Sequence, residues 1–208
     1  MSGQSNTKII YVGDPMCSWC YGLTNELASV INHFENEVDI EFVMGGLRPY
    51  YNVPMSQMKD FLADHWQHVN EASGQAFSYG ILDREDLNYD TEPPCRAVVA
   101  YKMLGGDQIA KFFADTQRAF YYNNKDMNQV ATYVSLLDGS GISASDFSVA
   151  FESNEMKENV RRDFERAAEM GVSSFPTILI EKDGNAKIVI RGYATAEQII
   201  SNIEKALK

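Results

Sequence analysis

The sequence has few basic residues and no long apolar run. Its 208 residues include 18 Lys and Arg against 29 Asp and Glu, a formal net charge of −11. Nucleic acids and anionic membranes both attract basic surfaces, so the acidic balance argues against either as a partner. No apolar run approaches the ~18 residues that a membrane-spanning helix needs. We therefore expect a protein that binds neither nucleic acid nor membrane.

The first residues also lack the pattern of a secretory leader. Residues 1–8 hold no basic segment followed by an apolar one, and the apolar run Ile9–Val12 is typical of a strand. We therefore expect no leader, and a cytoplasmic location.

Cysteine is scarce as well, with only Cys17, Cys20 and Cys95 present. A small, odd number in a chain of this length does not form a disulfide framework. Cys17 and Cys20 are spaced as Cys-x-x-Cys, which indicates a redox dithiol, half of a metal site, or two inert buried thiols. A zinc site needs further ligands, and no second cysteine or histidine pair follows at the required spacing. We therefore expect no metal.

The apolar pattern predicts a β-α-β unit, a long helical block and a β-β-α unit. Residues 8–12 and 38–44 are expected to be strands, with one helix from Cys17 to about His33 between them. From about Met55 to Met170 the pattern is almost wholly helical, with a helix start at Asp90 or Thr91. The last unit comprises strands 176–180 and 186–190, a turn at Asp183-Gly184, and helix 195–207.

The Cys-x-x-Cys pair falls at the predicted start of a helix. The first backbone N–H groups of a helix have no intrahelical partner, and together with the helix dipole they stabilise an anion. Cys17 is therefore the expected attacking thiolate. Cys20 lies on the same helix face, within reach to close or open a disulfide.

This order of elements resembles the thioredoxin fold of the DsbA family. Residues 14–22, 90–96 and 171–176 resemble segments of its cytosolic DsbA-like branch, which includes FrnE-like proteins and predicted protein disulfide isomerases. The resemblance implies an α/β thioredoxin-like fold with a large all-helical insertion. Residues 1–50 and 171–208 would form a discontinuous thioredoxin-like domain, and residues 51–170 the helical insertion domain.

The resemblance also implies a site and a reaction. Cys17 and Cys20 would be the catalytic dithiol of a thiol–disulfide oxidoreductase or isomerase, acting on protein or small thiol and disulfide substrates. Pro176 would be cis, and Phe175 would offer backbone groups to a substrate strand. Trp19 and Met16 would contact the substrate. The redox-active disulfide would serve in place of a tightly bound cofactor, with glutathione as a co-substrate.

The sequence departs from the family at the first strand. DsbA and thioredoxin carry a buried acid six residues before the first cysteine, where this sequence has Tyr11. Asp14 is the nearest acid, and it is expected either to relay protons or to cap the helix. Cys95, in the first turn of a later helix, is expected to be either an accessory thiol with a lowered pKa or a small semi-buried residue.

Two other functions remain open at this point. The fold also resembles kappa-class glutathione transferases and 2-hydroxychromene-2-carboxylate isomerase, which typically hold serine in place of the first cysteine. The presence of both Cys17 and Cys20 favours the dithiol mechanism over that glutathione-dependent one. The third alternative is a non-enzymatic adaptor whose dithiol switches its surface. The redox potential cannot be read from the Ser18-Trp19 pair between the cysteines. The redox direction, the substrate and the oligomeric state are left open by the sequence.

Overall fold

The structure is a computed structural model, and it describes residues 7–208. The expectation of a missing leader rests largely on residues 1–6, which lie outside the described residues. Across residues 7–208, no helix combines the length and the apolar composition needed to cross a bilayer.

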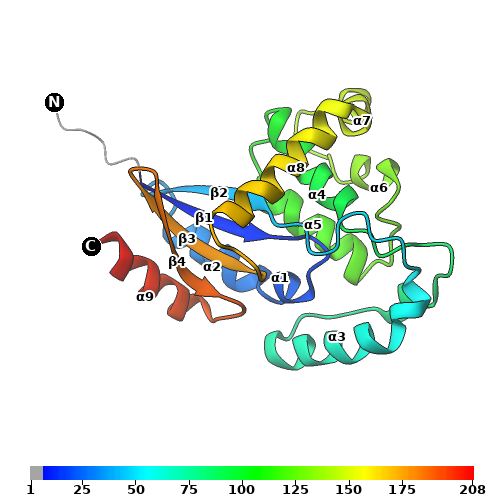
Figure 1. Cartoon of the computed structure of the whole chain (residues 1–208), viewed down its shortest axis with the longest axis horizontal. Coiled ribbons are helices and arrows are strands. Elements are labelled where there is room, and N and C mark those ends of the chain that lie inside the picture. The colour runs from blue at the N-terminus through cyan, green and yellow to red at the C-terminus, as the bar shows by residue number, and fades with distance from the viewer. Residues whose placement is uncertain (1–6) are drawn as a thin grey trace.

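The centre of the fold is a four-stranded sheet in the order β2-β1-β3-β4 (Figure 1). Strand β1 (Thr7–Gly13) pairs in parallel with β2 (Asp39–Met44) and antiparallel with β3 (Thr177–Lys182). Strand β4 (Asn185–Arg191) completes the hairpin with β3. Residues 9–12 of β1 are all buried, as a central strand covered on both faces requires.

Helices flank the sheet and fill the long interval between β2 and β3 (Figure 1). Short helix α1 (Ser18–Gly22) and α2 (Thr24–His33) connect β1 to β2, and α9 (Ala196–Leu207) follows β4. The interval holds α3 (Lys59–Ser73), α4 (Glu92–Met103), α5 (Ile109–Tyr121), α6 (Val130–Val134), α7 (Ala144–Glu152) and α8 (Asn154–Glu169), with 3-10 helices η1 (Met55–Met58) and η2 (Tyr79–Asp83). The predicted thioredoxin-like fold with inserted helices is confirmed. The predicted domain division at residues 50/51 and 170/171 stays a prediction.

The structure corrects two details of the predicted helices. The helix expected from Cys17 to His33 is divided at Leu23, where the Thr24 hydroxyl donates a hydrogen bond to the Tyr21 carbonyl. The segment between α3 and α4 is not helical apart from η2. At the start of α4, Thr91 is the N-cap residue, but its hydroxyl accepts the Arg48 N–H and makes no capping bond, while Asp90 accepts the Glu92 N–H.

The two faces of the sheet pack against different partners. Ile9 and Tyr11 of β1 belong to the main apolar core, which extends continuously into helices α4 and α5. Ile10 and Val12 point to the other face, where they pack with a smaller cluster that includes Ala167 of α8. Because side chains alternate along β1, one face of the sheet packs on the core that includes α4 and α5, and the other face packs on α8.

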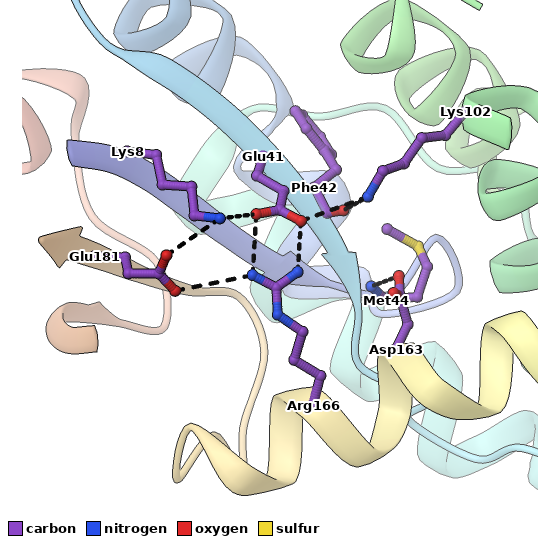
Figure 2. A network of polar contacts seen from close by, with 8 residues as sticks. All are labelled: Lys8, Glu41, Phe42, Met44, Lys102, Asp163, Arg166 and Glu181. Atoms are coloured by element: carbon purple, nitrogen blue, oxygen red, sulfur yellow. Dashed lines mark hydrogen bonds and ion pairs between the residues drawn. The ribbon is translucent and has the colours of Figure 1, made fainter. Parts of the chain in front are cut away.

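A network of charged side chains joins α8 to the sheet (Figure 2). Glu41 of β2 accepts hydrogen bonds from both terminal nitrogens of Arg166 on α8, and its carboxylate lies 2.9 Å from Lys8 Nζ. Lys8 also pairs with Glu181 of β3 at 3.2 Å. One turn earlier on α8, Asp163 Oδ2 accepts the Met44 N–H at 3.0 Å, which satisfies a donor at the end of edge strand β2. The network fixes the end of α8, from which the chain enters the loop before β3.

The network predicts a pH-dependent contribution to stability. The Arg166 guanidinium, followed by Lys8, lowers the pKa of Glu41 from 4.5 to about 2. Because the folded-state pKa lies below the ordinary value, the stabilisation is present above pH ~4.5 and is lost as the pH falls towards 2. Glu41→Gln should lower the free energy of unfolding by about 2–3 kcal/mol at pH 7. This deficit should shrink steadily below pH ~4.5.

Urea unfolding at pH 7 and pH 3 measures this difference. Glu158→Gln is the matched control, because Glu158 pairs with Arg161 on an exposed surface and its loss should change little at either pH. An equal deficit for Glu41→Gln at both pH values would contradict the assignment.

Candidate active site

Cys17 and Cys20 lie at the carboxyl end of central strand β1, where the chain turns into α1. Cys17 is the N-cap residue of α1 and is 5% exposed, whereas Cys20 inside the helix is 1% exposed. Both are free thiols on the same helix start, and they are near enough for Cys17 to raise the pKa of Cys20. The Cys17 N–H donates to the Asp14 carbonyl at 3.0 Å, which closes the turn between strand and helix.

The loop between α8 and β3 lies beside Cys17, because the start of β3 pairs with the end of β1. Gly171, with φ of 72°, follows the C-cap residue Met170 and lets the chain leave α8. The Phe175–Pro176 peptide bond is cis, as the resemblance implied. The Cys17 thiol donates to the Phe175 carbonyl oxygen with a sulfur–oxygen distance of 3.6 Å. A Cβ atom on Gly45 would lie 2.0 Å from the Phe175 ring, so only glycine after β2 leaves room for it.

A groove of about 280 Å³ opens between Cys17 and this loop. Besides Cys17, Ser18, Trp19 and Phe175, it is lined by Leu47 and Arg48 after β2, Phe61, Leu62 and His65 on α3, Tyr89 before α4, and Ser173 and Ser174 after α8. No motif in the sequence predicts that this second set of residues lines the groove. The available signals were the Gly45-Gly46 break, which places the next residues at the carboxyl ends of parallel strands, and the i, i+4 spacing of Phe61 and His65.

Aromatic side chains form one wall of the groove. The Trp19 ring meets the edge of His65 at a centroid distance of 6.1 Å, and Phe61 stacks on His65 at 5.8 Å. Burial lowers the pKa of His65, so its ring is neutral at pH 7. The wall therefore offers an uncharged aromatic surface beside Cys17.

Met16 does not reach the groove, which corrects the expectation that it contacts the substrate. Its side chain is 1% exposed and belongs to the main core. Its carbonyl oxygen accepts the Tyr89 hydroxyl at 2.7 Å, which fixes the turn with the side chain inward.

Asp14 is fully buried behind the turn. Its Oδ1 accepts the Met16 N–H at 2.8 Å, and its Oδ2 accepts the Leu47 N–H at 2.6 Å. It makes no side-chain capping bond to α1. Burial raises the pKa of Asp14, while these two N–H donors act in the opposite direction. The carboxyl group thus ties the loop before Cys17 to the loop that carries Arg48.

Cys95 lies in the first turn of α4, as expected, but it is 0% exposed. Burial raises the pKa of the Cys95 thiol well above its usual range, and the nearby Asp14 carboxyl adds to this. The direction is opposite to that expected for an accessory thiol at a helix start, because desolvation outweighs the effect of the helix terminus. Within residues 7–208, no three His, Cys, Asp or Glu side chains gather in a way that could hold a metal ion.

The electrostatics of Cys20 differ from those of an exposed thiol. Burial, followed by the contact with Cys17, raises the pKa of Cys20 well above its usual range. The Tyr11 hydroxyl and the Asp14 backbone N–H act in the opposite direction and lower the pKa of Cys20. Tyr11 thus lies beside the second cysteine, at the sequence position where the family has an acid.

These features define a thioredoxin-fold protein with two adjacent thiols that face a cis-proline loop. A family profile described as Thioredoxin matches residues 10–200, and the chain belongs to that family. A search of curated proteins found no match.

Solved structures support the same assignment. A candidate protein disulfide isomerase from Nitrosomonas europaea is similar at 30% identity, with 97% of each chain covered and a TM-score of 0.87. The cytosolic disulfide reductase DsbM from Pseudomonas aeruginosa is similar at 23% identity over 96% of this chain and 98% of that one, with a TM-score of 0.80. A structure of DsbM with glutathione is similar at 21% identity over the same shares, with a TM-score of 0.78. The predicted DsbA-like character of the fold is confirmed.

The burial of the three thiols predicts an order of chemical modification. Iodoacetamide should modify Cys17 first, because its sulfur borders the groove. Cys20 should react more slowly, and Cys95 should react only when the protein unfolds. Peptide mass mapping over time, with and without urea, measures the three rates. Equal labelling of Cys95 and Cys17 in the folded protein would contradict the site as described.

Proposed function

We propose that the protein is a thiol–disulfide oxidoreductase with a Cys17–Cys20 dithiol, able to act as a protein disulfide isomerase. The thiolate of Cys17 attacks a substrate disulfide, forms a mixed disulfide and releases one substrate thiolate. Cys20 then attacks the Cys17 sulfur, which forms the Cys17–Cys20 disulfide and releases the second substrate thiol. The observation that carries the proposal is the placement of two free thiols on one helix start, with Cys17 at the groove and Cys20 buried behind it.

The groove supports a polypeptide or a small peptide thiol as the substrate. The Phe175 carbonyl accepts the Cys17 thiol. A substrate cysteine joined to Cys17 would therefore lie beside the backbone of Phe175. An extended chain can pair with that backbone with little sequence specificity. The apolar wall of Trp19 and Phe61 fits side chains that flank the cysteine.

Glutathione is the proposed small co-substrate. Its cysteine would lie at Cys17, and Arg48 provides a cation in the groove that can bind a carboxylate. The similarity to DsbM, described in complex with glutathione, supports this part of the proposal. A cytoplasmic location and a redox-active disulfide in place of a bound cofactor belong to the same proposal.

Asp14 is proposed to position the groove. Its carboxyl group links the Met16 N–H to the Leu47 N–H, on opposite sides of the active-site turn. Both oxygens of this carboxyl group are engaged by backbone N–H groups, which supports a positioning role over a direct proton relay to Cys20.

The two cysteines should have different mutant phenotypes. Cys17→Ser should abolish the protein's acceleration of insulin reduction by dithiothreitol and of the refolding of scrambled ribonuclease, because the attacking sulfur is lost. Cys20→Ala should keep the first attack and accumulate mixed disulfides with the substrate, visible as adducts by mass spectrometry. Cys95→Ala is the matched control and should keep both activities. Full turnover of Cys20→Ala with glutathione as the only thiol would exclude the dithiol mechanism and favour the glutathione-dependent alternative.

A further inference from the structure

Tyr11 holds a polar group in the interior of the fold. The residue lies in central strand β1 and is 0% exposed. Its ring packs against Phe42 and Phe113 at centroid distances of 5.1 Å and 5.6 Å. Because both neighbours are themselves buried core residues, the ring is fixed and the hydroxyl cannot turn towards solvent.

Gly13 allows this hydroxyl to lie against the backbone at the end of β1. A Cβ atom at Gly13 would come within 2.7 Å of Tyr11 Oη and 2.6 Å of the ring. Any residue larger than glycine would therefore displace the hydroxyl. The absence of a side chain at Gly13 positions Oη at the strand end, directly beside the turn that carries the cysteines.

The Tyr11 hydroxyl is buried and has no hydrogen-bond partner among the described residues. A buried hydroxyl without a partner is destabilising, so its presence calls for an explanation. The side chain whose charge acts most strongly on Tyr11 is that of Cys20. The Tyr11 hydroxyl in turn lowers the pKa of Cys20, as does the Asp14 backbone N–H. Both groups therefore favour the negative charge that the Cys20 sulfur carries during the reaction.

We propose that the Tyr11 hydroxyl is a catalytic residue of the resolving step, donating a hydrogen bond to the Cys20 sulfur as it becomes a thiolate. The inference rests on the proposed dithiol function. In this proposal the uncharged Tyr11 hydroxyl stabilises the negative charge on the Cys20 sulfur.

The reaction balances without a change in the charge of Tyr11. The Cys20 thiol loses its proton to solvent, its sulfur attacks Cys17, and the Cys17–substrate disulfide breaks. The departing substrate sulfur leaves as a thiolate and takes up a proton from solvent. The ionisable groups that face Tyr11 are Cys20, Cys17 and Asp14, and with burial as the largest cause they raise the pKa of Tyr11 well above its usual range. Tyr11 therefore remains a donor and does not act as a base.

Reaction with 5,5′-dithiobis(2-nitrobenzoic acid) separates the two steps. Attack by Cys17 releases one nitrothiobenzoate, and resolution by Cys20 releases a second from the mixed disulfide. In Tyr11→Phe, the first release should keep its rate and the second should slow about tenfold, because a hydrogen bond to a charged group is lost. The pH at which the second release reaches half its maximal rate should also rise, because less thiolate forms at a given pH.

Tyr133→Phe is the matched control. Tyr133 is equally buried and donates to the Met127 carbonyl oxygen, away from Cys17 and Cys20, so both releases should keep the wild-type rates. If Tyr11→Phe releases the second nitrothiobenzoate at the wild-type rate and with the wild-type pH profile, Tyr11 only fills space and the inference is wrong. If wild type releases one equivalent only, the dithiol function itself fails.

A second measurement applies if Tyr11→Phe folds poorly in the presence of both cysteines. In a Cys17→Ser background, iodoacetamide labelling of Cys20 across pH reports its thiolate directly. Adding Tyr11→Phe should move the half-labelling pH upward by about one unit, which corresponds to a tenfold loss of thiolate. An unchanged half-labelling pH would overturn the inference.

Discussion

The antiparallel pairing of β1 with β3 is the constraint on which the site depends, because it brings the Cys17 thiol to the Phe175 carbonyl, 158 positions away. The register of β1 and β3 produces this contact. Val12 pairs with Thr177, so the last residues of β1 and the residues just before β3 meet at one edge of the sheet. Cys17 follows that end of β1 through a short turn, and Pro176 immediately precedes β3. The groove is therefore a consequence of strand pairing, to which the two loops add side chains.

The inserted helices contribute to the same edge from a distance. Helix α8 delivers the chain to residues 171–176, and its last turns are fixed to β2 by Arg166 and Asp163 (Figure 2). Helix α3 packs against α1 and supplies Phe61 and His65 to the aromatic wall. Because one continuous core joins the sheet to these helices, the position of the groove walls depends on that core.

Local patterns in the sequence predicted the strands, the Cys-x-x-Cys turn and the helix over residues 195–207, since each depends on neighbouring residues. In the structure, a capping box of Thr195 and Gln198 begins that helix. The cis bond at Pro176 came from the family resemblance. The direction of the Met16 side chain depends on the geometry of a turn, which no periodic pattern encodes. The pKa of Cys95 depends on burial, which outweighs the helix start and requires the tertiary structure. The spacing of Phe61 and His65 predicts only that the two side chains share a helix face. That this face lines the groove depends on how α3 packs against α1.

The reduction potential of the Cys17–Cys20 pair tests the central claim most directly. The protein would be equilibrated in glutathione redox buffers, quenched by alkylation and analysed by mass. The account predicts an intramolecular disulfide that titrates as one two-electron couple, within the range of about −120 to −270 mV found for thioredoxin-fold dithiols. A value near the upper end would indicate an oxidant or isomerase, and one near the lower end a reductant. If no intramolecular disulfide forms and a single glutathione adduct persists on Cys17, the dithiol account is contradicted.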